Sequence, residues 1–368
     1  MQHHVSSKEM NQTNTKSIYS LTLEEMRQSL ADAKLPKYAA DQVYQWIYKQ
    51  NKYLPESWSN VSKKVKNHLL TNFTWDLPKR VWEGVSTDGT RKFLIGLVDG
   101  QTIETVAIFS KERVTLCISS QVGCAIGCTF CYTGTLGLTR HLASEEIVGQ
   151  YLMVNQRLRE LDLLREDQNP NIVYMGQGEP LHNFDNVSQA TKVIMEPKGI
   201  GLGQRKITLS TSGLVPQIEK LSDFPPVNIA ISLHAARDNL RTELMPINKA
   251  YDLKRLFEAI KTIPLKGHRS ITYEYILISE YNDGEEDVAG LLGLLDKKKS
   301  KINLIPFNEH PSSKFKKPTP EKVDWFRKQF LDRGYVCTVR VTKGDDIYAA
   351  CGQLKNEVEQ NNKPQLTL

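Results

Sequence analysis

Residues 114 to 306 alternate short apolar stretches with helical patterns, and this alternation restricts the possible folds more than any other feature of the sequence. Helical periodicity covers 144–158 and 253–263, for example. Repeated strand–helix units predict a parallel sheet with helices packed outside it. We expect an α/β fold built on a partial (β/α)6 barrel, because too few strands are present for a full eight-stranded barrel. The expected barrel strands are 114–119, 172–175, 206–210, 228–232, 272–277 and 301–306.

The chain before this region predicts a small N-terminal helical domain and a β-hairpin extension. Thr22 and Glu25 have the spacing of a capping box at a helix start, and further helices are expected over 38–49 and 61–70. Asp88-Gly89 predicts the hairpin turn. The expected divisions are a disordered leader (1–17), a helical RNA-binding accessory domain (18–78), the β extension (79–112), the barrel (113–343) and a C-terminal segment with a polar tail (344–368).

The bulk composition is that of a globular protein, with 40% hydrophobic and 24% charged residues. No apolar run approaches the roughly 18–20 residues that span a membrane, and the first residues lack the apolar core of a secretory signal. Six cysteines, three of them clustered, do not resemble a disulfide scaffold, so we expect a cytoplasmic protein. The net charge is +6. Its lysine clusters are typical of solvated surfaces and are also compatible with a phosphate-backbone partner.

Cys124, Cys128 and Cys131 form a C-x3-C-x2-C motif directly after the first expected barrel strand. Three thiolates in eight residues can hold one inorganic centre, and no fourth cysteine lies nearby. A structural zinc site and an ordinary [4Fe–4S] cluster each use four protein ligands. Three ligands would leave one iron open for a small molecule. The alternatives are a zinc knuckle in an RNA-binding protein, which would borrow a distant ligand, and chance clustering of cysteines.

Polar residues follow several of the expected strands, where the carboxyl ends of a parallel sheet converge. Together they predict a site for a small polar ligand at the same end as the cysteines. Two further cysteines lie outside the motif: Cys117 precedes it on a strand, and Cys351 has small neighbours that allow close approach. The polar stretches are Gly176-Gln-Gly-Glu179-Pro180, Ser210-Thr-Ser-Gly213, Ser232-Leu-His234 and Asn308.

These motifs together resemble one family. Phe130 before the last cysteine completes the pattern of radical S-adenosylmethionine (SAM) enzymes. The further runs Met245-Pro-Ile-Asn248, Asn303-Leu-Ile-Pro-Phe-Asn308 and Ala349-Ala-Cys351-Gly-Gln-Leu354 make the chain similar to the dual-specificity RNA adenine-C2 methyltransferases over about 18–355. These methylate an adenine of 23S ribosomal RNA and one in transfer RNA. Gln177 departs from the family, which usually has Met there.

Related resistance enzymes methylate carbon 8 of the same ribosomal adenine. They usually carry Gly-Glu-Ala where this chain has Gly178-Glu179-Pro180. The proline therefore favours the carbon-2 enzyme, and the carbon-8 enzyme is the alternative.

The resemblance implies a mechanism that uses two SAM molecules per methyl transferred. It implies that Cys351 accepts the methyl group, that Cys117 later attacks the sulfur of Cys351, and that Glu104 is the proton acceptor. Cys124, Cys128 and Cys131 would hold a [4Fe–4S] cluster. SAM would be bound by Gly178, Glu179, Ser210, Ser232, Leu233, His234 and Asn308. The implied partners are 23S rRNA, tRNA and an electron donor such as a flavodoxin; we expect a monomer and no membrane association.

Overall fold

The computed structural model describes residues 16–111, 113–265 and 269–355. Most of the expected leader, and the polar tail after residue 355, therefore lie outside the described residues. The described part contains a ten-stranded sheet in the order β1-β2-β3-β4-β7-β8-β9-β10-β11-β12. Its strands are β1 (Lys79–Val85), β2 (Arg91–Gly96), β3 (Thr102–Ser110), β4 (Arg113–Cys117), β7 (Asn171–Tyr174), β8 (Ile207–Thr211), β9 (Asn228–Ser232), β10 (Ile271–Leu277), β11 (Ser300–Pro306) and β12 (Val336–Val339).

In the sheet order from β4 through β7, β8, β9, β10 and β11 to β12, each strand runs parallel to the next. The expected barrel strands are all present, and the short edge strand β12 adds one more to the parallel set. Side chains from β7, β8, β9, β10 and β11 line one shared cavity, so the sheet curves around it. The prediction of an α/β partial barrel is therefore confirmed.

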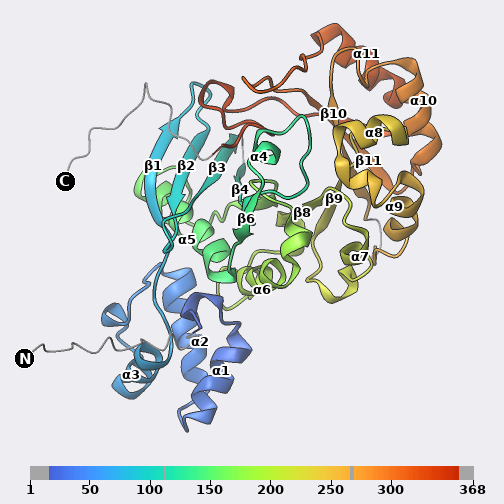
Figure 1. The fold of residues 1–368 in the computed structure, drawn as a ribbon. Coiled ribbons are helices and arrows are strands. Elements are labelled where there is room, and N and C mark those ends of the chain that lie inside the picture. Colours follow the sequence, from blue (N-terminus) through green and yellow to red (C-terminus); the bar gives the residue numbers. More distant parts are fainter. Residues whose placement is uncertain (1–15, 112, 266–268, 356–368) are drawn as a thin grey trace, which may run out of the picture.

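Helices cover the outside of the curved sheet (Figure 1). Helix α9 shows why: Leu253, Leu256 and Ile260 recur at helical spacing and are buried, whereas Lys254 and Arg255 between them are exposed. None of the helices in the described ranges is long and apolar enough to cross a membrane. The main helices are α5 (Ser144–Glu160), α6 (Phe184–Met195), α7 (Val215–Ile218), α8 (Asp238–Leu244), α9 (Leu253–Ile260), α10 (Glu285–Leu294) and α11 (Pro320–Leu331).

The N-terminal domain is helical and packs below the barrel in Figure 1. The predicted capping box is present, since Thr22 Oγ1 accepts from the Glu25 amide at 3.2 Å and Glu25 accepts from the Thr22 amide at 2.7 Å. The predicted second helix changes character after Tyr44 and continues as a π-helix. Gln189 on α6 donates to the Ser20 carbonyl at 2.9 Å and joins the domain to the barrel. The elements are η1 (Ile18–Ser20), α1 (Leu23–Asp32), α2 (Tyr38–Tyr44), η2 (Gln45–Lys49), η3 (Pro55–Ser57) and α3 (Lys63–Asn72).

The β extension is part of the barrel sheet, because β3 pairs antiparallel with β4. Its hairpin turns at Asp88-Gly89 as predicted, and Gly89 has a φ of 85°. After β12 the chain crosses to this hairpin. Asp346 accepts a hydrogen bond from Ser86, and the Gly344 amide donates to Asp88 at 3.1 Å. The C-terminal segment, residues 344–355, is thereby fastened across the sheet.

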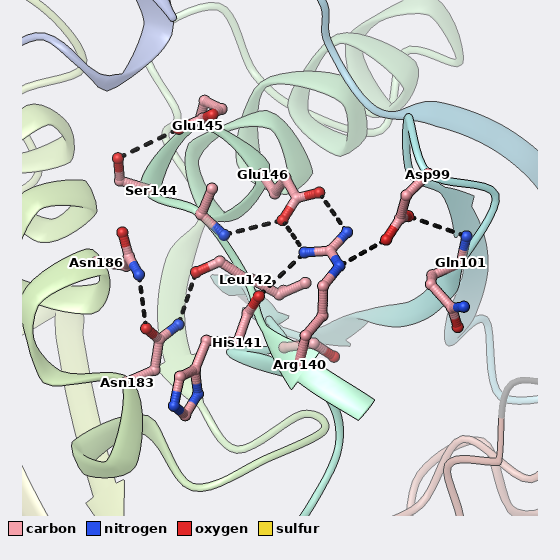
Figure 2. A network of polar contacts seen from close by, with 12 residues as sticks. Asp99, Gln101, Arg140, His141, Leu142, Ser144, Glu145, Glu146, Asn183 and Asn186 are labelled. Carbon is pink, nitrogen blue, oxygen red and sulfur yellow. Dashed lines mark hydrogen bonds and ion pairs between the residues drawn. The ribbon is translucent and has the colours of Figure 1, made fainter. Parts of the chain in front are cut away.

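Arg140 joins three parts of the fold next to the cysteine motif (Figure 2). It lies on β6 (Leu138–His141), which pairs with β5 (Gln121–Gly123) to bracket the motif. Its guanidinium is 2.6 Å from Asp99 in the β2–β3 turn and 2.8 Å from Glu146. Glu146 also accepts from the Ala143 amide at 2.9 Å and so caps α5. One side chain therefore fixes β6 relative to the extension and to α5.

Replacing Arg140 with Ala should lower the free energy of unfolding by about 1 kcal/mol, because two carboxylates lose a charged donor at a partly exposed site. Chemical denaturation would measure the change. Arg165→Ala is the matched control, since Arg165 is 67% exposed and 3.9 Å from Asp167; it should change stability little. Equal effects of the two substitutions would contradict the assigned role of Arg140.

Candidate active site

The three cysteines of the motif lie on one loop at the carboxyl end of the parallel sheet. The Cys124 amide donates to the Gly137 carbonyl at 2.8 Å, and the Cys131 amide donates to the Cys128 carbonyl at 3.1 Å. Gly123 has a φ of 76°, and a Cβ there would lie 1.9 Å from the Gly137 oxygen. Only glycine therefore allows the two ends of the loop to meet so closely. The short helix α4 (Tyr132–Thr135) begins directly after Cys131.

Burial dominates the electrostatics of these three thiols. It raises the pKa of Cys124 to about 12, and it also raises the pKa values of Cys128 and Cys131. The neighbouring cysteines raise the pKa of Cys128 further. Three soft donors that resist ionisation by themselves are suited to bound iron, whose positive charge stabilises the thiolates. Within the described chain, no group of three His, Cys, Asp or Glu side chains is placed to hold a single metal ion.

A cavity extends from the cysteine loop into the barrel. Its lining combines the motif with polar groups at the ends of successive strands, as the sequence predicted. Of the predicted site residues, the cavity is lined by Cys124, Cys128, Cys131, Gly178, Glu179, Ser210, Ser232, His234 and Cys351.

Glu179 is buried in the wall of this cavity with both carboxylate oxygens engaged. One oxygen accepts from the Ser212 amide and hydroxyl, each at 2.7 Å, and the other accepts from the Leu181 amide at 3.0 Å. Burial nevertheless raises the pKa of Glu179 above its ordinary value. Gly178 before it has a φ of 96°, and a Cβ there would lie 2.5 Å from the Gln121 side chain. The turn therefore requires glycine.

His234 presents a neutral imidazole to the cavity. Its Nδ1 accepts from the Ile276 amide at 3.0 Å, which places the ring proton on Nε2. Burial and then the nearby Arg241 lower the pKa of His234 to about 3. The ring packs edge-on against Phe130 of the cysteine loop, with centroids 4.9 Å apart. His234 can thus donate a hydrogen bond from Nε2 without carrying a charge.

The C-terminal segment brings Cys351 to the cysteine loop through direct hydrogen bonds. The Tyr132 amide donates to the Gly352 carbonyl at 2.7 Å, and the Thr133 hydroxyl donates to the Leu354 carbonyl at 2.7 Å. Asn308 donates to the Cys351 carbonyl itself at 3.1 Å. Thr133 and Leu354 are 221 positions apart in the sequence, so these bonds join two distant parts of the chain beside Cys351.

Cys117 lies against the same segment but outside the cavity lining. It belongs to a small buried cluster with Ala349 and Leu354, which flank Cys351. Burial raises the pKa of Cys117 to about 12, and the Cys351 sulfur contributes in the same direction. The Arg340 guanidinium opposes this effect. Both cysteines are free thiols, so the structure places two thiols and one cation in a common environment.

Four other residues singled out in the sequence do not line this cavity. Leu233 points into the main core, and its amide donates to the Glu274 carbonyl at 3.0 Å. Asn308 holds the Cys351 carbonyl. Gln177 is buried, and its side-chain oxygen accepts from the Glu104 amide at 3.3 Å. Glu104 is fully buried on β3, where one oxygen lies 3.0 Å from Lys92 Nζ and the other accepts from the Lys355 amide at 2.8 Å.

The sequence patterns did not predict three basic residues of the site. Arg241 is fully buried and donates to the Ser212 carbonyl at 2.8 Å and to Asn248 at 2.8 Å; burial lowers its pKa to about 10. Arg340 lines the cavity, and Lys92 pairs with Glu104. An isolated Lys or Arg carries no motif. A basic residue within an apolar strand, as in Arg91-Lys-Phe-Leu-Ile95, was the one available signal.

Comparisons with known proteins agree with this geometry. Residues 118–292 match the family model of the radical SAM superfamily, and residues 16–74 match that of the ribosomal RNA large subunit methyltransferase N-terminal domain. A crystal structure of a radical SAM methyltransferase from Sphaerobacter thermophilus aligns with a TM-score of 0.85 and 39% identity, covering 93% of this chain and 100% of that one. The fold and the site thus define a radical SAM protein, a class that uses a [4Fe–4S] cluster and SAM.

Curated relatives narrow the class. The dual-specificity RNA methyltransferase RlmN of a Nitratiruptor species is 43% identical, over 93% of this chain and 98% of the relative. The protein of that name from Wolinella succinogenes is 41% identical, over 93% and 97%. The chain belongs to the RlmN family of dual-specificity RNA methyltransferases.

The Lys92–Glu104 pair should be required for stability. Lys92→Met would leave a fully buried carboxylate without its cation, and we expect a loss of about 3 to 5 kcal/mol in the free energy of unfolding. Lys92→Met/Glu104→Gln removes the charge but keeps an acceptor for the Lys355 amide, so it should recover part of the loss in denaturant titrations. A Lys92→Met protein as stable as the unsubstituted chain would contradict this role.

Proposed function

We propose that this protein is a radical SAM enzyme that methylates carbon 2 of an adenine in 23S rRNA and in tRNA. Family membership supports the substrate class. The observation that carries the proposal is the position of Cys351, which lines the same cavity as Cys124, Cys128 and Cys131. A methyl-carrying thiol beside the site of radical formation is what methylation of an electron-poor ring carbon requires, because that carbon is not a nucleophile.

Two groups of residues would hold the cofactors in this proposal. Cys124, Cys128 and Cys131 would hold a [4Fe–4S] cluster, and the cluster together with SAM would supply the radical chemistry. The glycine turn and the polar strand ends bind SAM, with the neutral His234 imidazole and the Ser212-bound Glu179 as fixed polar groups. Leu233 and Asn308 complete the proposed SAM-binding set. Their contacts support an indirect contribution to SAM binding: the Leu233 amide is bonded to the Glu274 carbonyl, and the Asn308 side chain is bonded to the Cys351 carbonyl.

Cys351 carries the methyl group in the proposal, and Cys117 releases the product. Removal of a hydrogen atom from the S-methyl group of Cys351 lets that carbon bond to carbon 2 of the adenine. The adduct then loses the carbon-2 proton, to Glu104 in the proposal, and one electron, which the cluster would take back. Attack by the Cys117 thiolate on the Cys351 sulfur forms a disulfide and breaks the sulfur–carbon bond; the electron pair stays on the carbon, which takes up a proton to become the methyl group of the released RNA. The shared cluster with Ala349 and Leu354 supports this pairing. Arg340 favours the Cys117 thiolate, since it lowers a thiol pKa that burial raises.

The remaining partners follow from the same chemistry. We propose that a flavodoxin-like protein supplies electrons, that the enzyme acts as a monomer, and that it works in the cytoplasm, where the thiols stay reduced. The carbon-8 enzyme is the main alternative activity. Mass spectrometry of digested substrate RNA separates 2-methyladenosine from 8-methyladenosine, and a product methylated only at carbon 8 would overturn the proposal.

Cys351→Ala should abolish methylation of RNA while iron content and SAM binding stay normal, because the residue accepts the methyl group and holds no iron. Nucleoside mass spectrometry and iron analysis would test both parts. Cys117→Ala should instead accumulate a covalent protein–RNA adduct, visible as a shifted band on a denaturing gel. Formation of 2-methyladenosine by Cys351→Ala would refute the role of this thiol, and free product from Cys117→Ala would refute the resolving step.

Glu104 is proposed as the proton acceptor. The register of β3 and β4 supports this role. Val106 on β3 lies opposite Cys117 on β4, and Glu104 is two positions before Val106, so Glu104 and Cys117 face the same side of the sheet. Glu104→Gln keeps an acceptor for the Lys355 amide but cannot take a proton. We expect turnover to fall about 10²- to 10⁴-fold, the usual contribution of a general base, with the methyl group still loaded on Cys351. Turnover near that of the unsubstituted enzyme would leave Glu104 with an anchoring role alone.

A further inference from the structure

A second groove meets the first cavity at Cys351. Both are lined by Ile305, Arg340 and Cys351. The second groove continues toward the amino ends of the parallel strands, where Asn171 begins β7 and Asn228 begins β9. The cysteine motif lies at the opposite, carboxyl end. Cys351 can therefore be approached from two directions.

The lining of this groove is strongly cationic. Six lysines and arginines contribute to it and no aspartate or glutamate does, as far as the described residues show. The whole chain has 48 basic and 42 acidic residues, so this bias does not reflect its overall composition. The cations are Lys111, Arg113, Arg205, Lys206, Arg340 and Lys343.

Most of these cations are available to a partner. Lys111, Arg113, Arg205 and Lys206 are exposed, and none of them forms an ion pair with a described residue. Lys343 lies 3.7 Å from Asp88. Glu112 lies outside the described residues. An exposed cationic groove whose charges are so little neutralised by carboxylates of the described chain is suited to a polyanion.

The positive lining extends beyond the groove on both sides. Lys111 and Arg113 also line a neighbouring hollow that reaches Arg165, where Asp162 is the one acidic residue of the described chain among three cations. Arg205 also lines another hollow that reaches Arg269 and Lys301. The cations thus form a track along the amino ends of the strands. A track suits a chain with one negative charge per nucleotide better than it suits a single anion.

We propose that the groove residues Lys111, Arg113, Arg205 and Lys206 hold the RNA backbone, and that the target adenine enters the barrel here and reaches Cys351 from the amino ends of the strands. The inference rests on the proposed function and adds the direction and surface of substrate entry. The uncharged polar side chains of Asn171, Thr208 and Asn228 line the same groove. They offer hydrogen bonds to an unstacked base. SAM and the cluster would occupy the other cavity, so substrate and cofactor do not compete.

Arg205→Ala/Lys206→Ala tests the surface directly, since both side chains are exposed and neither forms an ion pair with a described residue. The full-length reconstituted enzyme is titrated with a fluorescent RNA hairpin carrying the methylatable adenine in its loop. We expect Kd to rise about tenfold at moderate salt, and the slope of log affinity against log salt to fall by about 1.5, as for two lost phosphate contacts. Loading of the methyl group onto Cys351, measured by intact-protein mass, should be unchanged.

Lys254→Ala/Arg255→Ala is the matched control. It removes an adjacent Lys–Arg pair that is also exposed, in the first turn of α9 on the outside of the barrel, and RNA binding should stay as in the unsubstituted enzyme. Lys314→Ala/Lys316→Ala/Lys317→Ala tests entry through another exposed loop. RNA affinity that falls in the triple variant but not in Arg205→Ala/Lys206→Ala would overturn the inference. The inference would also be overturned if Arg205→Ala/Lys206→Ala lost binding of a flavodoxin while its RNA binding stayed unchanged.

The proposed function can be refuted independently of the groove assignment. If the unsubstituted enzyme makes no 2-methyladenosine, that proposal is wrong whatever the groove binds. If it makes 2-methyladenosine and Arg205→Ala/Lys206→Ala has the same Kd, salt slope and KM for RNA, only the groove assignment is wrong. A raised KM with nearly unchanged kcat in that variant would support both.

Discussion

The hydrogen bonds between the cysteine loop and the C-terminal segment are the interaction on which the site depends. Tyr132 and Thr133 donate to the carbonyls of Gly352 and Leu354, and these bonds fix the main chain that carries Cys351. The segment belongs to no strand of the barrel. It stays in place because the loop, the β hairpin and the buried Lys92–Glu104 pair all hold it. Cys351, the thiol proposed to accept the methyl group, is thus positioned by contacts between segments far apart in the sequence.

This arrangement explains why the β extension continues the barrel sheet. A separate linker could not hold the C-terminal segment at a constant distance from the cysteine loop. Because β3 pairs with β4, Glu104 and Cys117 share one rigid surface, and the Lys355 amide docks onto it. Arg140 ties the same extension to the base of the cysteine loop. Stability and chemistry are therefore coupled: loosening the extension should displace Cys351 before it unfolds the barrel.

The barrel strands and the cavity lining could be predicted because both depend on local patterns. Apolar periodicity marked the strands, and the carboxyl-end rule for parallel sheets placed Glu179, Ser210, Ser232 and His234 together from the sequence alone. The π-helix after Tyr44 could not be predicted, since a helical pattern does not distinguish α from π. Arg340 and Lys92 were missed for another reason: their roles come from partners far away in the chain, and a single basic residue carries no motif.

Cys351 lines both cavities, and this would give the proposed reaction a spatial order. A thiol that receives a methyl group and later delivers it, as proposed for Cys351, needs access to both cofactor and substrate. Separate entrances would serve this better than a single one, because RNA bound at the cluster would block SAM. Arg340 lies where the two cavities meet, beside both free thiols. Its charge lowers the pKa of Cys117 against the effect of burial. In the proposed scheme the junction of the two cavities therefore favours the Cys117 thiolate while RNA is still attached to Cys351, which is when the resolving attack has to occur.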